Sequence, residues 1–144
     1  MDGMSQKLEQ VQAEVNKVIK GKEDVVKKVL AAVIAGGHIL MEDIPGVGKT
    51  TLATTFAKSM SMHYKRVQFT PDLMPSDITG LNVYSQKDGE FHLVKGPVFT
   101  NVLLADEINR ATPRTQASLL EAMEEKQVTI DGESHRLEAP FFVI

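Results

Sequence analysis

The segment Gly46-Val47-Gly48-Lys49-Thr50 decides the fold of this chain. A short apolar stretch at residues 38–41 precedes it, and apolar residues at helical spacing follow it over 52–60, so the pattern predicts a strand, a glycine-rich loop and a helix. Glycines let the backbone turn tightly enough for successive N–H groups to point inward, and the helix N-terminus adds positive potential. The segment is therefore typical of a phosphate-binding loop (P-loop); a tight strand-to-helix connection that merely contains a lysine is the alternative.

The loop predicts a site for ATP and Mg2+. The residues expected to bind the nucleotide lie in this loop and at the helix start, and they are Gly46, Val47, Gly48, Lys49, Thr50 and Thr51. Lys49 reaches the outer phosphates and assists catalysis, while the Thr50 hydroxyl is a hard oxygen ligand for Mg2+. The formal pattern G-x-x-x-x-G-K-[ST] has a glycine where this chain has Asp43, whose short side chain tolerates turn geometry. The departure weakens the match to the pattern rather than the mechanism.

An acidic pair follows a predicted buried strand. Four apolar residues, 102–105, lead directly into Asp106 and Glu107. The pair therefore lies at the carboxyl end of a strand, where ligands of open parallel sheets bind. We expect Asp106 to hold Mg2+, directly or through water, and Glu107 to act as the general base that polarises the attacking water. A solvated acidic strand end is the alternative, and the P-loop upstream favours the functional interpretation over it.

The order of the predicted elements indicates the fold class. Apolar runs alternate with helical segments, which predicts an α/β fold with a parallel sheet covered on both faces. Two amphipathic helices are expected in residues 1–35 and a P-loop α/β subdomain in 36–144. Asp-Gly pairs predict two inserted β-hairpins, with strands at 81–85 and 90–94 and at 127–130 and 134–137. Residues 141–144 have the pattern of a buried strand, so we expect the core to be incomplete at this end.

Composition narrows the range of partners. The net charge is −3, from 16 basic and 19 acidic residues, and no basic stripe is interleaved with aromatics, so nucleic acid is not the expected partner. The chain has no cysteine, which excludes disulfides and thiolate metal sites. Its longest apolar stretch, residues 29–35, is too short to span a bilayer. We therefore expect a soluble cytoplasmic protein with no membrane partner.

Three stretches resemble the MoxR family of AAA+ ATPases, and they are Met41–Thr50, Gln68–Gly80 and Leu104–Ala111. The resemblance extends from about Val18 to Ile144, and Asp43 fits the usual form of the loop in this family. It implies the three-layer αβα P-loop NTPase architecture of an AAA+ core. The two hairpins then resemble the helix-2 insert and the pre-sensor-1 hairpin, which are implied to face the central pore of a hexameric ring; plain sheet decoration explains them equally well.

The resemblance also implies further site residues. Residues 18–21 correspond to the N-terminal segment that packs on adenine, which makes Ile19 and Gly21 nucleotide-binding residues, although a helix end with a glycine cap explains them as well. Gln68 either holds Glu107 away from the water, as polar residues do at comparable places in AAA+ proteins, or is an exposed strand residue. Sensor 1, the fifth core strand, the arginine finger and the helical lid with sensor 2 would follow Ile144, so hydrolysis by residues 1–144 alone stays open.

The expected function is ATP binding and hydrolysis that drives chaperone-like remodelling or maturation of partner proteins. The partners implied by the resemblance are metal-cofactor enzymes and proteins with von Willebrand factor A domains, engaged by a homo-oligomeric ring. A nucleotide-gated binding module that hydrolyses little is a different class of function, and magnesium chelatase motor subunits share the same AAA+ branch. A DNA-remodelling relative fits the acidic charge balance less well.

Overall fold

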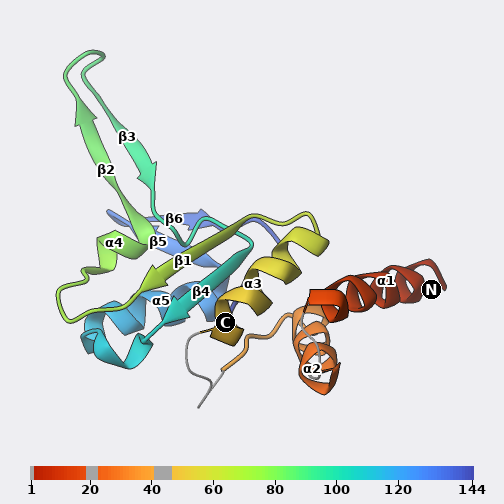
Figure 1. Ribbon diagram of the computed structural model, residues 1–144. Coiled ribbons are helices and arrows are strands. Elements are labelled where there is room, and N and C mark those ends of the chain that lie inside the picture. Colours follow the sequence, from red (N-terminus) through yellow and green to blue (C-terminus); the bar gives the residue numbers. More distant parts are fainter. Residues whose placement is uncertain (1, 19–22, 41–46) are drawn as a thin grey trace.

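A three-stranded parallel sheet forms the centre of the molecule (Figure 1). The computed structural model describes residues 2–18, 23–40 and 47–144. The strand order is β1-β4-β7, with bounds β1 Tyr64–Gln68, β4 Val102–Asp106 and β7 Phe142–Val143. The stretch predicted as a strand at 38–41 runs beside β7, since the Ile39 N–H donates to the Val143 carbonyl at 2.9 Å; residue 41 lies outside the described residues. The predicted parallel sheet is confirmed.

Helices cover both faces of this sheet. Alternate residues of a strand point to opposite faces, so β4 presents Val102 and Leu104 to one side and Leu103 to the other. Val102 and Leu104 pack with α3 (Val47–Ser59), while Leu103 packs with α5 (Pro113–Glu125), and all three side chains are fully buried. Helix α5 begins at an N-cap threonine, Thr112, whose hydroxyl oxygen accepts the Thr115 N–H at 3.4 Å. The result is the predicted three-layer arrangement.

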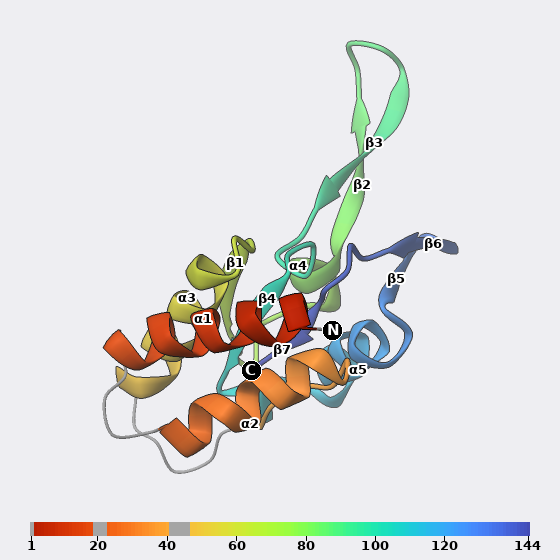
Figure 2. The same cartoon turned by 90° about the vertical axis from the view of Figure 1, so that its right-hand side faces the viewer.

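Two further helices pack against the outer side of α3. They are α1 (Asp2–Val18) and α2 (Glu23–Ile34), as the amphipathic pattern predicts. Figure 2 shows both in front of the sheet. Their apolar faces meet α3 in a buried cluster of Val15, Val26, Val29, Leu30, Leu52 and Phe56. No helix in the described residues is long and apolar enough to cross a lipid bilayer.

The two predicted hairpins form antiparallel pairs that do not join the central sheet. Strands β2 (Gly80–Ser85) and β3 (Glu90–Lys95) form the first, and β5 (Gln127–Ile130) and β6 (Glu133–Arg136) the second. The β2–β3 hairpin projects well away from the core (Figures 1 and 2). It carries five large apolar side chains that are about half exposed or more, which are Leu81, Val83, Tyr84, Phe91 and Val94.

Two short elements depart from the sequence-based expectation. The segment before β2 contains a one-turn helix, α4 (Pro75–Thr79), at whose start the Asp77 carboxylate accepts the Met74 N–H at 2.8 Å. A 3-10 turn, η1 (Ile108–Arg110), follows the acidic pair. Neither was predicted, because an element of three to five residues is shorter than the window in which helical periodicity can be recognised.

Candidate active site

The first turn of α3 and the end of β4 lie at the same edge of the sheet. Helix α3 ends at Ser59, and the chain enters β1 at Tyr64 after a short connection, so the last turn of α3 lies at the edge where the strands begin. Its first turn, Val47–Thr50, therefore lies at the opposite edge, where β4 ends in Asp106. Asp106 follows Leu104 by two residues, so its side chain is on the face that α3 covers.

Several predicted nucleotide-binding residues lie outside the description. Gly46, Ile19 and Gly21 belong to the segments that the structure does not describe, and for Val47, Gly48 and Lys49 only the helical backbone is described. Thr50 and Thr51 are partly buried in the first turn of α3. The carbonyl of Thr50 accepts a hydrogen bond from the Thr54 hydroxyl at 2.8 Å. Thr51 lines a groove of about 630 Å³ between α3 and α1, to which Glu14 and Lys58 also contribute.

The acidic pair occupies two different environments. The Asp106 side chain is 25% exposed, whereas Glu107 is exposed beyond the strand end. Glu107 has left-handed backbone angles, φ 58° and ψ 41°, and its carbonyl accepts the Arg110 N–H at 3.0 Å, which starts η1. A left-handed glutamate costs roughly 1–2 kcal/mol, and such strain is typical of functional sites. The left-handed turn ends β4 at Asp106, so Glu107 does not continue the strand.

Arg66 on the neighbouring strand contacts the predicted metal ligand. Its guanidinium nitrogen Nη2 donates to Asp106 Oδ2 at 2.8 Å, an ion pair between side chains that are 46% and 25% exposed. The register explains the contact: Gln68 pairs with Asp106 and Arg66 with Leu104, so Arg66 projects from the same face two residues earlier. The hydrogen bond to Asp106 raises the pKa of Arg66 above its usual value, so the guanidinium is fully charged.

Arg66 was not predicted as a site residue. It lies two residues before Gln68, so strand periodicity places both side chains on one face. This periodicity links Arg66 to Asp106 only when it is known that β1 pairs with β4, and tertiary packing sets that pairing. Gln68 itself is exposed, and no described residue forms a hydrogen bond with its side chain. Of the two interpretations left open for Gln68, the structure therefore favours an exposed strand residue.

The donors at this edge suit magnesium. A hydroxyl from Thr50 and a carboxylate from Asp106 are hard oxygen donors, which Mg2+ prefers to nitrogen or sulfur. Both residues are only partly buried, so the remaining coordination positions are open to water and phosphate oxygens, as Mg2+ sites in phosphate-binding proteins require. The residues therefore fit the metal, on the condition that Arg66 releases the Asp106 oxygen it now contacts.

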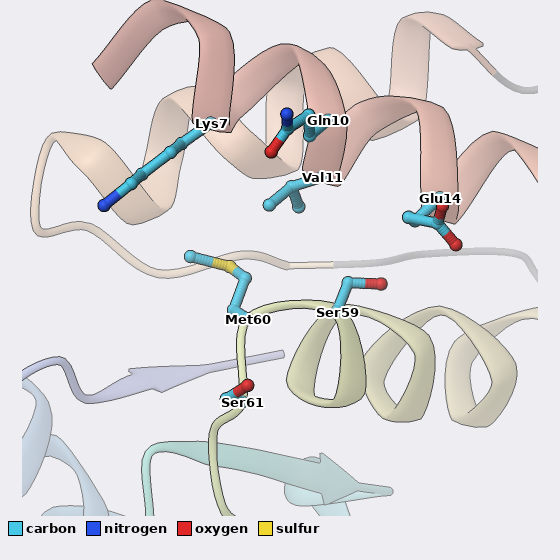
Figure 3. Close-up of a pocket in the computed structure, with 7 residues that line it drawn as sticks. All are labelled: Lys7, Gln10, Val11, Glu14, Ser59, Met60 and Ser61. Atoms are coloured by element: carbon cyan, nitrogen blue, oxygen red, sulfur yellow. The ribbon is translucent and has the colours of Figure 1, made fainter. Parts of the chain in front are cut away.

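A larger groove lies elsewhere on the molecule. A groove of about 680 Å³ lies between α1 and the end of α3. Figure 3 shows Val11 and Met60 pointing towards each other in this groove, with Lys7 and Glu14 on either side of them. It is at the end of α3 opposite to Thr50, so it cannot be the phosphate site.

A second set of possible metal ligands lies at the tip of the β2–β3 hairpin. Ligand atoms of Asp88, Glu90 and His92 lie within 4.8 Å of one another, and all three residues are exposed. The Asp88 carboxylate is already hydrogen-bonded to the His92 ring, which lowers the pKa of Asp88. Since all three side chains are exposed and the Asp88 carboxylate already has a hydrogen-bonding partner, we assign the hairpin tip no metal.

Comparisons with known proteins identify this chain's relatives as ATPases and chaperones. The family model described as "ATPase family associated with various cellular activities (AAA)" matches residues 38–144. The Bacillus subtilis protein YeaC is 53% identical over 130 residues, covering 90% of this chain and 41% of YeaC. The Mycobacterium tuberculosis chaperone MoxR1 is 44% identical over 137 residues, covering 95% of this chain and 36% of MoxR1.

A solved structure agrees as well. The crystal structure of a candidate ATPase from Cytophaga hutchinsonii superposes with a TM-score of 0.84 at 46% identity, covering 96% of this chain and 42% of that one. The chain thus spans about two fifths of the length of these three proteins.

Proposed function

This chain belongs to the MoxR family of AAA+ ATPases, and from that membership we propose that it binds ATP with Mg2+ and hydrolyses the terminal phosphate bond. One observation carries the proposal: the first turn of α3 and the acidic end of β4 lie at one edge of the sheet, on the same face. Ligands of open α/β sheets bind at the carboxyl ends of the strands, where these two elements meet.

The proposed chemistry assigns one role to each residue. Backbone N–H groups at the start of α3 bind phosphate oxygens, and Lys49 pairs with the outer phosphates. Thr50 and Asp106 would hold Mg2+, which when bound supplies positive charge that offsets the charge on the phosphate oxygens. Glu107 accepts a proton from a water whose oxygen bonds to the terminal phosphorus, while the bond from that phosphorus to the bridging oxygen breaks and releases ADP.

We extend the proposal to the work of the whole protein. The relative MoxR1 is named a chaperone, which supports ATP-driven remodelling or maturation of a partner protein, including partners with von Willebrand factor A domains. We propose a homo-hexameric ring in the cytoplasm. The projecting β2–β3 hairpin supports assembly or client contact, because an isolated two-stranded hairpin with half-exposed apolar side chains is marginally stable in water.

Calorimetry and a phosphate-release assay test the proposal. Titration of ATP in the presence of Mg2+ should give saturable heat, and added ATP should be converted to ADP and phosphate. Absence of binding would overturn the proposal. Binding without turnover would instead support a nucleotide-gated binding module, the second candidate, which the Arg66–Asp106 ion pair favours because it occupies a predicted metal ligand.

A further inference from the structure

We propose that Arg66 competes with Mg2+ for the Asp106 carboxylate, so that the metal must displace the guanidinium before the site is complete. The inference rests on the proposed function, since it takes Asp106 as a ligand of the nucleotide-bound metal. It adds a residue that acts on the site through another: Arg66 is a positioning residue that holds Asp106 and controls when the carboxylate becomes available.

The contact is built into the sheet. Residues 64–68 of β1 pair in parallel with 102–106 of β4, and this register brings Arg66 and Asp106 to the same face although 40 residues separate them. Arg66 Nη2 lies 2.8 Å from Asp106 Oδ2, and no other described acidic residue forms an ion pair with Arg66. The guanidinium therefore occupies one oxygen of the carboxylate that the metal needs.

The positive charges of Arg66 and Mg2+ make them compete for the Asp106 carboxylate. A guanidinium and a divalent cation repel each other, so both cannot contact one carboxylate at low cost. Arginine does not lose its proton in proteins, so the guanidinium keeps its charge at this contact, and a competing cation can displace it from the carboxylate. The pair must therefore break when the metal arrives.

Exposure makes the displacement reversible. The Arg66 side chain is 46% exposed, and exposed ion pairs contribute little to stability, so water can solvate the guanidinium once it leaves Asp106. A free metal ion would be held at the site by the Asp106 carboxylate as its only negative ligand. An ion that arrives with the nucleotide is also held by the negative phosphate oxygens, which stabilise it at the site. Arg66 thus ties the availability of Asp106 to the arrival of the metal together with the nucleotide.

The test measures how strongly Mg2+ strengthens nucleotide binding. The dissociation constant of the fluorescent nucleotide mant-ADP is determined for the protein in excess EDTA and in excess Mg2+. The value in EDTA divided by the value in Mg2+ is the ratio that is compared between variants. Arg66→Ala removes the competitor, and Arg66→Gln keeps most of its bulk. Lys65→Ala is the matched control, since it removes the same charge from the adjacent position of β1, where the side chain points to the opposite face.

We expect the ratio to rise about two- to fivefold in both Arg66 variants, as for removal of an exposed ion pair, and to stay unchanged in Lys65→Ala. In an Asp106→Asn background the Arg66 substitutions should no longer alter the ratio. A purely structural role would change both dissociation constants together and leave the ratio constant.

Two results separate this inference from the function on which it rests. If the unaltered protein binds mant-ADP but the Arg66 variants show the same or a lower ratio, competition at Asp106 is refuted while the nucleotide site stands. If the unaltered protein binds no mant-ADP even with Mg2+, the proposed function is overturned and this inference with it.

Discussion

Gly80 and Gly96 lie backbone to backbone where the β2–β3 hairpin leaves the core: a Cβ atom on Gly96 would lie 2.5 Å from the Gly80 nitrogen. Both glycines are buried, and Gly80 has a positive φ of 91°. The Gly96 N–H donates to the Thr79 carbonyl at 3.3 Å and the Val98 N–H to the Ile78 carbonyl at 3.1 Å. The projecting hairpin is therefore attached to the core through main-chain contacts that leave no room for a side chain.

Gly96→Ala should destabilise the protein by at least about 1–3 kcal/mol, the range for overpacking, because its Cβ would meet backbone atoms that cannot move independently. Urea denaturation measures the change. Gly37→Ala is the control, since its Cβ would lie 3.6 Å from the Ala32 carbonyl oxygen, an ordinary contact, and the change should be close to neutral. Equal midpoints for the two variants would contradict the close packing at Gly96.

His38 should make stability depend on pH. Its Nδ1 accepts the Val143 N–H at 3.0 Å, so the proton of the neutral ring is on Nε2, 2.9 Å from the Met123 carbonyl oxygen. The Lys126 ammonium lies 2.9 Å from the same nitrogen. Burial, and after it the charge of Lys126, lower the pKa of His38, while the Met123 hydrogen bond acts in the opposite direction.

Because the folded-state pKa is lower than the unfolded one, the unfolded chain binds more protons in the interval between them. The stabilisation is complete above about pH 6.5, the ordinary histidine value, and is lost as the pH falls through the folded-state pKa. Urea denaturation of the unaltered protein and of His38→Gln at pH 7.5 and 5.5, approximate settings either side of that value, should show a smaller pH effect in the variant. His63→Gln, at an exposed histidine, should keep the original pH effect. If the free energy of unfolding changes equally between the two pH values in all three proteins, His38 is not the source of the pH dependence.

Lys49→Ala should weaken nucleotide binding. A charge-assisted contact to phosphate is worth roughly 1.5–3 kcal/mol, so the dissociation constant should rise by about one to two decades. Calorimetric titration with ATP and Mg2+ measures it. Lys58→Ala, in the last turn of the same helix, is the control and should bind like the unaltered protein. Equal affinity of the Lys49 variant would remove this residue from the site.

Glu107→Gln should abolish most turnover and spare binding. Loss of a general base costs about 10²- to 10⁴-fold in rate, whereas the amide keeps the shape of the side chain. Phosphate release under saturating ATP measures turnover, and calorimetry measures binding. A variant that hydrolyses ATP at the original rate would exclude Glu107 as the base.

Glu107→Asn should raise stability where Glu107→Gln does not. Asparagine tolerates left-handed angles better than glutamate or glutamine, so it should recover part of the roughly 1–2 kcal/mol that these angles cost. The free energy of unfolding from urea denaturation measures the gain, expected at about 0.5–1 kcal/mol. If the asparagine and glutamine variants unfold at the same urea concentration, the turn stores no strain at Glu107.

Local patterns accounted for most of the elements. The apolar run at 102–105 predicted β4 and the position of Asp106 at its end, and the Asp-Gly pairs predicted both hairpins. These predictions succeeded because strand burial and turn chemistry depend on residues close together in the sequence. The helix α4 was missed because five residues carry too little periodicity, and η1 because its backbone follows from the left-handed turn at Glu107.

The sequence by itself determined the fold class, the presence of helix α3 and the acidic end of β4, since each depends on neighbouring residues alone. Only the tertiary structure decided that Arg66 faces Asp106, that Gly80 meets Gly96, and that His38 joins Val143. Strand order and register depend on the burial of whole faces summed over distant segments, so no local pattern contains them.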